Sequence, residues 1–213
     1  MPKDKIPGCT SCGTTNCSSL DKIFPPFCPT QKFAELNEQT LQLSATEELI
    51  LQAAAEIEGE FYKKATRIQE IILFAQKIKA KKIGIATCKG LLHEAKIFSK
   101  ILTAQGIEHY SVICKVGAND KTCINLDPKY KINKGSGHET MCNPILQAKI
   151  LNQEKTDLNV VIGLCVGHDS LFYKHSDALV TTLITKDRVL GHNPVAALYT
   201  AHSYYSHLEK DKI

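Results

Sequence analysis

Apolar residues recur at helical spacing in the first part of the chain. From Phe33 to about Glu60 they predict helix, and Ser44, followed three residues later by Glu47, has the capping-box pattern of a helix start inside this stretch. Thr66 and Gln69 repeat the pattern before a clearer helix, whose apolar face consists of Ile68, Ile71, Ile72, Ala75 and Ile78. We therefore expect a helical segment before residue 81.

Beyond this segment the pattern changes to strands that alternate with helices. The expected strands are 82–88, 109–114, 158–165 and 178–185, and the expected helices are 91–105, 144–153 and a final one from Pro194 to about His207. Such alternation favours parallel strands, because each helix returns the chain to the edge from which the last strand began. The pattern predicts an α/β fold with a mostly parallel four-stranded sheet, flanked by helices in a Rossmann-like three-layer arrangement.

The first 32 residues differ from the rest of the chain. They are rich in Cys, Pro, Ser and Thr and have no hydrophobic period, so they cannot fold around a core of their own. The whole chain of 213 residues is 43% hydrophobic, which is ordinary for a globular protein. We expect a cysteine-rich metal- or cluster-binding lobe at 1–32, a helical segment at 33–80 and an α/β domain at 81–213.

The formal net charge of +4 comes from scattered lysines and arginines, so we expect no nucleic-acid partner. No apolar stretch is long enough to span a membrane, and no signal peptide follows Met1, so we expect a cytoplasmic protein without a membrane partner. Nine cysteines in a reducing compartment are more typical of metal ligands or reactive thiols than of disulfides.

Four cysteines near the N-terminus have the spacing of a metal site. Cys9 and Cys12 form a C-x2-C pair, and Cys17 and Cys28 follow within twenty residues. The cysteine–proline pair at residue 28 favours a 4Fe–4S cluster, because structural zinc sites more often have two C-x2-C pairs. Zinc is the alternative, and a disulfide or free thiols would be the explanation without a metal.

A second group of cysteines is placed together by the predicted strands. Cys88, Cys114 and Cys165 each lie at the carboxyl end of a predicted parallel strand, the edge at which such sheets bind ligands. Cys142 precedes Asn143-Pro144, a predicted helix start, where the positive end of the helix favours a thiolate. We expect these four thiols to contribute to cofactor binding, although any one of them alone is more typical of core packing.

The turn after the third strand is the candidate catalytic segment. Cys165, His168 and Asp169 supply a thiol, an imidazole and a carboxylate, and His192 precedes an Asn-Pro pair as Cys142 does. His138 and Glu139 lie in a polar connection before Cys142 whose glycines match neither dinucleotide nor P-loop spacing. Cys123 lies in the same connection and is expected to be a bystander thiol.

Three sequence runs are distinctive: Met141-Cys142-Asn143-Pro144-Ile145, Gly163 to Leu171 and Lys186 to Val195. They resemble a family of uncharacterised cysteine-rich proteins, found largely in anaerobic bacteria and archaea and expected to bind metal. The resemblance implies metal binding and an anaerobic setting without naming a reaction. All the cysteines except Cys123 fall in the family-like segments.

These observations lead to one main hypothesis and two alternatives. The main hypothesis is an iron–sulfur protein, a redox or cluster-dependent oxidoreductase or lyase, whose N-terminal lobe covers the carboxyl edge of the sheet and whose partner is a small-molecule substrate or an electron-transfer protein. The alternatives are a noncatalytic zinc or metal module for sensing, storage or delivery, and a cysteine-dependent hydrolase or transferase with structural zinc. The sequence leaves open whether the protein forms a homo-oligomer.

Overall fold

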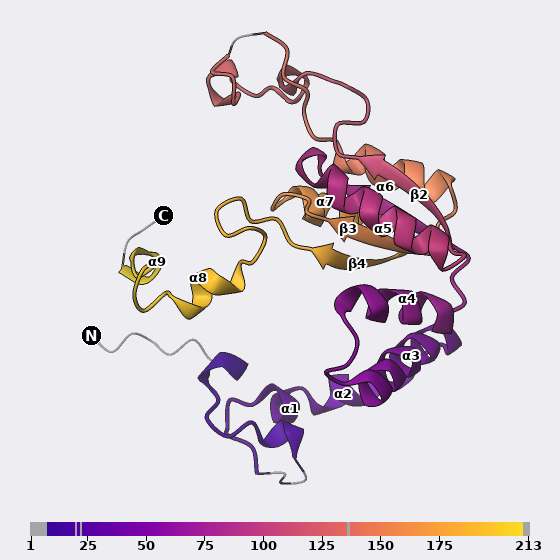
Figure 1. Ribbon diagram of the computed structural model, residues 1–213. Helices are drawn as coiled ribbons and strands as arrows, with labels where there is room; N and C mark the ends of the chain where they lie inside the picture. Colours follow the sequence, from indigo (N-terminus) through magenta and orange to yellow (C-terminus); the bar gives the residue numbers. More distant parts are fainter. Residues whose placement is uncertain (1–7, 20, 22, 136, 211–213) are drawn as a thin grey trace. The chain divides into compact units, whose positions relative to one another are not determined.

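The computed structural model describes residues 8–19, 21, 23–135 and 137–210 (Figure 1). This part of the chain divides into two compact units, one ending at Ala55 and the other beginning at Glu56, and each is described by itself. No helix among the described residues is long and apolar enough to cross a membrane.

The first unit consists of short turns followed by helices. Its elements are η1 (Cys9–Ser11), η2 (Asn16–Ser18), α1 (Pro29–Lys32), α2 (Ala34–Thr40) and the start of α3 (Ala45–Phe61). The break predicted near Ser44 is confirmed: the Ser44 N–H donates to the Glu47 carboxylate at 2.8 Å, and the Glu47 N–H donates to the Ser44 hydroxyl at 3.3 Å.

The second unit contains the sheet. Its strands are β1 (Lys82–Thr87), β2 (Glu108–Ile113), β3 (Leu158–Ile162) and β4 (Leu179–Ile184). All are parallel, in the order β2-β1-β3-β4, as the alternating pattern predicts. Its helices are α4 (Arg67–Lys77), α5 (Leu92–Ala104), α6 (Pro144–Gln153), α7 (His168–His175), α8 (Val195–Tyr199) and α9 (His207–Lys210), with short turns η3 (Lys89–Leu91), η4 (Lys121–Ile124) and η5 (Pro128–Tyr130).

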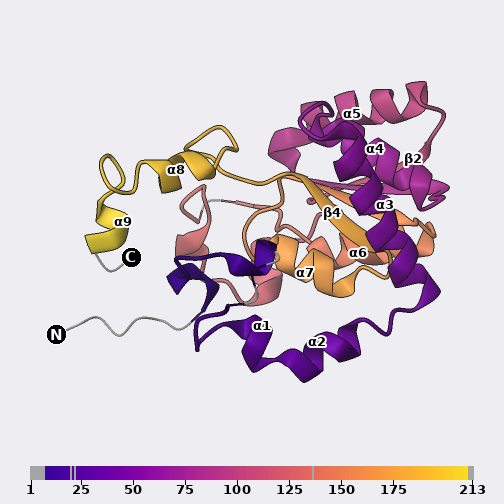
Figure 2. The same cartoon turned by 90° about the horizontal axis from the view of Figure 1, so that it is seen from below.

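Helices cover both faces of the sheet, which gives the expected three layers (Figures 1 and 2). On one face Ile72 of α4 and Phe98 of α5 pack with Ile85 of β1. On the other face Leu151 of α6 and Phe172 of α7 pack with Val161 of β3. The capping box of Thr66 and Gln69 starts α4, as predicted.

Two predictions about helices are wrong. The segment after the third strand is not a simple turn, because α7 begins at His168 and is anchored by the fully buried Phe172. The final helix does not run from Pro194 to His207: α8 ends at Tyr199, and turns connect it to α9. The Thr200 hydroxyl donates to the Ala196 carbonyl at 2.7 Å, and such side-chain bonds compete with helix continuation.

Gly84 allows the sheet to pack closely against α6. A Cβ atom at this position would lie 1.9 Å from Oδ1 of the buried Asn159 and 2.9 Å from Cδ1 of Leu151. Gly59, by contrast, is exposed on α3 and has nothing within 4 Å of its Cβ position.

We therefore predict opposite effects for two Gly→Ala substitutions. Gly84→Ala should lower the free energy of unfolding by about 1–3 kcal/mol through overpacking. Gly59→Ala should leave it unchanged or raise it by up to about 1 kcal/mol, because alanine favours helix. Urea denaturation of both variants measures the difference. Equal stability of the two variants would contradict the packing shown for Gly84.

Candidate functional site

Two of the cysteines continue neighbouring strands at the carboxyl edge of the sheet. Thr87 pairs with Ile113 at the end of the β1–β2 ladder, and Cys88 and Cys114 are the next residues. The Cys114 N–H donates to the Thr87 carbonyl at 2.8 Å, so the ladder extends to the cysteines. Side chains in a strand alternate between faces, so both thiols join the face covered by α6 and α7.

Cys142 reaches this edge through the start of α6. The Asn143 side chain caps the helix by accepting from the Leu146 N–H at 3.0 Å, as predicted, and the Asn143 N–H donates to the Cys114 carbonyl at 2.8 Å. This second bond fixes the residue after Cys142 against the end of β2. The Sγ atoms of Cys142 and Cys114 are consequently 3.8 Å apart.

Cys88, Cys114 and Cys142 form what we call the thiol cluster, with His168 at its side. Cys114 contacts both other thiols, and the His168 imidazole contacts Cys142 from the first residue of α7. Cys88 and Cys114 are buried, and Cys142 and His168 are half-buried. Tertiary structure thus brings together one residue from each of four separate segments.

The three thiols have different protonation states because they interact. The Cys114 thiol is the largest cause of a pKa lowered to about 5 for Cys88, aided by the Gly90 N–H and the Lys186 ammonium group. It is also the largest cause of a pKa lowered to about 4 for Cys142, followed by His168. The pKa of Cys114 is raised, first by Cys142 and then by Cys88 and burial. Cys114 therefore keeps its proton between two thiolates.

Cations around the cluster favour these thiolates. Lys186 follows β4 and lies close to the Gly90 backbone, since its Nζ would be 3.6 Å from a Cβ atom at Gly90. Lys115 follows Cys114 and lowers the pKa of Cys142, while the Cys142 sulfur is the main cause of a raised pKa for His168. Neither lysine is among the residues predicted from the sequence. Their positions directly after β2 and after β4 were the available signal, because strand ends meet at one edge.

The other three candidate catalytic residues each contact a different group. Cys165 lies beyond the end of β3 rather than within the strand, and its sulfur accepts from the Arg188 guanidinium at 2.9 Å. The Asp169 carboxylate accepts from the Ser170 N–H at 2.7 Å. His192 Nδ1 accepts from the Asp187 N–H at 3.1 Å, within the loop before α8. Cys123 is exposed on η4.

The N-terminal cysteines belong to the first unit. Cys9 and Cys12 share one turn, in which the Cys12 N–H donates to the Cys9 carbonyl at 3.1 Å. Cys17 is exposed on η2, and Cys28 is buried at the start of α1. The Thr15 backbone is the largest cause of a lowered pKa for Cys12. Their grouping around one metal, and the placement of this lobe over the sheet, remain predictions.

No metal-binding arrangement is complete in the described parts of the chain, which omit residues 1–7, 20, 22, 136 and 211–213. Among the described residues, no three Cys, His, Asp or Glu side chains are positioned to enclose an ion as they stand. The thiol cluster is held by pairwise contacts, and its sulfurs and imidazole do not surround a common point.

Comparison with known proteins shows the family. The model for the family of proteins of unknown function DUF1847 matches residues 28–183. The chain belongs to the DUF1847 family. Uncharacterized protein MJ0455 of Methanocaldococcus jannaschii is 53% identical over 153 residues, which cover 72% of this chain and 77% of that protein. No solved structure matches the chain significantly.

The DUF1847 match contains the whole thiol cluster and His168. It does not reach Cys9, Cys12 or Cys17, so the expectation that these three cysteines fall in the family-like part of the chain is wrong. It also spans Cys123, so the expectation that this residue falls outside the family-like part of the chain is wrong. Cys123 is nevertheless an exposed thiol, on the long connection between β2 and α6.

The lowered pKa of Cys142 gives a prediction about reactivity. A lowered pKa means that thiolate is present at lower pH, so alkylation of Cys142 in metal-free, reduced protein should be half-maximal near pH 4–5, far below the midpoint of N-acetylcysteine. The plateau rate should be below that of the free thiol, because low-pKa thiolates are weaker nucleophiles. Iodoacetamide labelling across a pH series, read by mass spectrometry, measures the midpoint.

His168 provides the control for this experiment. His168→Gln removes the imidazole that favours the Cys142 thiolate, so the midpoint should move to higher pH. His175→Gln, at the other end of α7, should leave it unchanged. If both variants match the unsubstituted protein, the pairing of Cys142 with His168 does not exist in solution.

Proposed function

We propose that this protein binds a metal ion through the thiol cluster, with Cys88, Cys114 and Cys142 as thiolate ligands and His168 as the fourth ligand. The observation that supports this most is the 3.8 Å separation of the Cys114 and Cys142 sulfurs. Two thiolates on one tetrahedral zinc ion, each about 2.3 Å from the metal, lie about 3.8 Å apart. Three cysteines and one histidine are a common zinc donor set.

Electrostatics supports the same assignment. The Lys115 and Lys186 ammonium groups favour the thiolates of Cys142 and Cys88, but Cys114 keeps its proton because a third thiolate between these two would add repulsion. A divalent cation would replace that proton and compensate the charge of the third thiolate. Side-chain rotations would then draw the Cys88 sulfur and the His168 imidazole towards the ion.

A 4Fe–4S cubane suits the thiol cluster less well than a single ion. Ligand thiolates of a cubane bind different iron atoms and lie farther apart than two ligands of one metal. The iron–sulfur interpretation is better kept for Cys9, Cys12, Cys17 and Cys28, whose C-x2-C turn motivated it. A cluster on these four cysteines would have ligands other than those of the thiol cluster.

A cysteine-dependent hydrolase or transferase is the second candidate function. The Cys142 thiolate beside the His168 imidazole has the pairing of an activated nucleophile and its base. In that case both residues must stay free of metal. Metal removal therefore distinguishes the two functions. It leaves the activity of a cysteine-dependent enzyme intact, and it abolishes an activity that depends on metal in the thiol cluster.

Proton release on metal binding tests the proposed ligands. At pH 7 only Cys114 and the protonated fraction of His168 have protons to lose, so zinc binding should release about one to two protons, whereas three ordinary thiols would release about three. Isothermal titration calorimetry in buffers of different ionisation enthalpy measures this number. A variant with Ser at the four N-terminal cysteines isolates the site. Release of about three protons would contradict the thiolate assignment.

Removal of one ligand tests the assignment independently. Cys114→Ser should weaken zinc binding at the thiol cluster by about 100-fold or more, because it removes the thiolate that contacts both others. The exposed Cys123→Ser is the matched control and should bind as before. After anaerobic purification, the metal content and the acid-labile sulfide content are measured. Together they report the metal bound at the thiol cluster and at the four N-terminal cysteines. Equal metal content in Cys114→Ser and Cys123→Ser proteins would exclude the thiol cluster as a ligand set.

A further inference from the structure

A pocket of about 770 Å³ lies beside the thiol cluster, where the connection after β2 leaves the sheet. Its walls include Lys89 and Leu92 from the β1–α5 junction, Ile113 and Lys115 from the end of β2, and Ile132 and His138 from the long connection. The volume lies in the range of small-molecule sites. We infer that this pocket binds a small organic anion, a phosphate ester or carboxylate with a short apolar chain.

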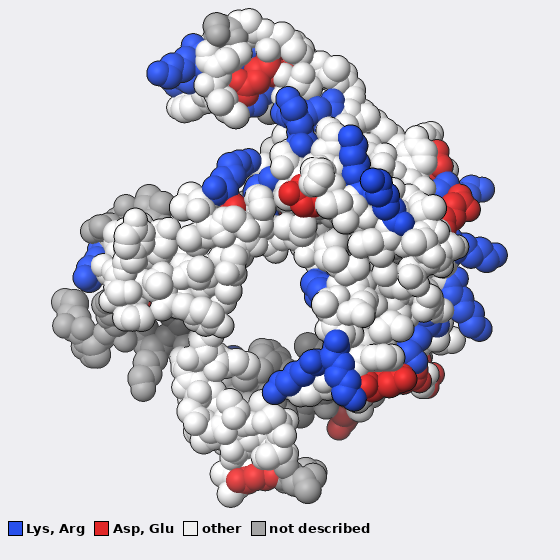
Figure 3. All heavy atoms as spheres, in the orientation of Figure 1, with Lys and Arg blue, Asp and Glu red and all other residues white. Residues whose placement is uncertain are grey.

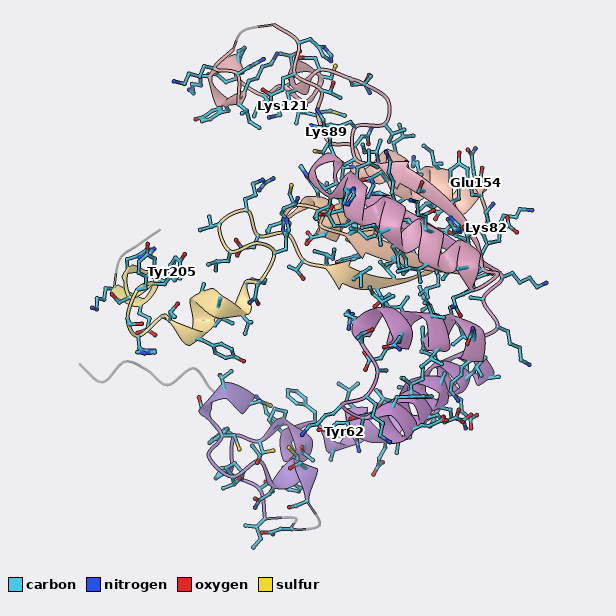
Figure 4. All side chains as sticks on the ribbon, viewed as in Figure 1. Tyr62, Lys82, Lys89, Lys121, Glu154 and Tyr205 are labelled. Atoms are coloured by element: carbon cyan, nitrogen blue, oxygen red, sulfur yellow. The ribbon has the colours of Figure 1, made fainter. Side chains whose placement is uncertain are left out.

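Positive charge predominates in the pocket. Lys89 is exposed and Lys115 is half-buried. Among the described residues that line the pocket, the one acidic group, Glu139, already forms an ion pair with Lys121 and accepts from the Asn133 N–H at 3.1 Å. Lys89 and Lys121 are labelled in Figure 4, and Figure 3 shows basic side chains gathered where the connection leaves the sheet. The Lys115 ammonium donates to the Thr140 carbonyl at 2.5 Å and has further N–H groups to donate, so the two lysines in the lining favour an anionic ligand.

Apolar side chains complete the walls. Leu92, Ile113 and Ile132 line the pocket, and Ile132 is 87% exposed to water. Burying an exposed isoleucine against a ligand is favourable, so the apolar part of a ligand gains affinity here. A ligand with both an anionic head and an aliphatic chain matches both parts of the lining.

The lysines connect this pocket to the thiol cluster. Lys89 and Lys115 directly follow Cys88 and Cys114, and the Lys89 N–H donates to the Cys114 sulfur at 3.3 Å. The same two strand ends therefore supply the thiols and the cations. Anion binding goes beyond the proposed metal function and does not require it, because the lining residues are outside the proposed ligand set.

Binding of butyl phosphate tests the inference. By isothermal titration calorimetry, butyl phosphate and pentanoate should both bind, inorganic phosphate should bind more weakly than butyl phosphate, and 1-butanol should not bind measurably. Lys89→Gln and Lys115→Gln should each weaken butyl phosphate binding by about fivefold to tenfold. Ile132→Ser should weaken butyl phosphate by about threefold to tenfold and leave inorganic phosphate unchanged.

Lys100→Gln is the matched control, since it removes the same charge from an exposed position on α5 that does not line the pocket. Its butyl phosphate affinity should equal that of the unsubstituted protein. The inference is overturned if butyl phosphate does not bind, if Lys100→Gln weakens binding as much as Lys89→Gln, or if Ile132→Ser has no effect. Zinc content measured on the same samples reports the metal site separately, so failure of the anion-binding inference does not imply failure of the proposed metal binding.

Discussion

The functional part of this protein depends on one constraint, the repulsion between negative charges on closely spaced thiolate sulfurs. Cys114 contacts both Cys88 and Cys142 at a mostly buried edge of the sheet, where three negative charges would be unfavourable without nearby cations. The protein meets this constraint with one retained proton on Cys114, the His168 imidazole and the ammonium groups of Lys115 and Lys186. A bound metal ion would satisfy the same constraint more completely.

The parallel sheet holds the sulfurs in these positions. The Gln147 side chain on α6 donates to the Thr87 carbonyl at 3.2 Å and the Val112 carbonyl at 2.8 Å, which ties the two strands together just before Cys88 and Cys114. Gln147 is fully buried, so these bonds form in a weakly polar environment, where they are strong and costly to lose. Cys88 and Cys114 directly follow these two strands, whereas Cys142 and His168 come from the starts of α6 and α7.

Much of this arrangement follows from local patterns in the sequence. The capping boxes at Ser44 and Thr66 and the start of α6 at Asn143-Pro144 depend on residues within one turn, and they are confirmed. The α7 helix was missed because its polar start resembles a turn and its support comes from tertiary contacts, among them the burial of Phe172. The cations around the cluster were missed for a similar reason: Lys186 is far from Cys88 in sequence, and only strand order places them together.

The identity of the atoms around a bound metal is the central question for this account. X-ray absorption at the zinc edge of the zinc-loaded protein, with Ser at the four N-terminal cysteines, measures that shell directly. The account predicts three sulfur neighbours at about 2.3 Å and one nitrogen neighbour at about 2.0–2.1 Å. A shell of only nitrogen and oxygen neighbours would contradict it.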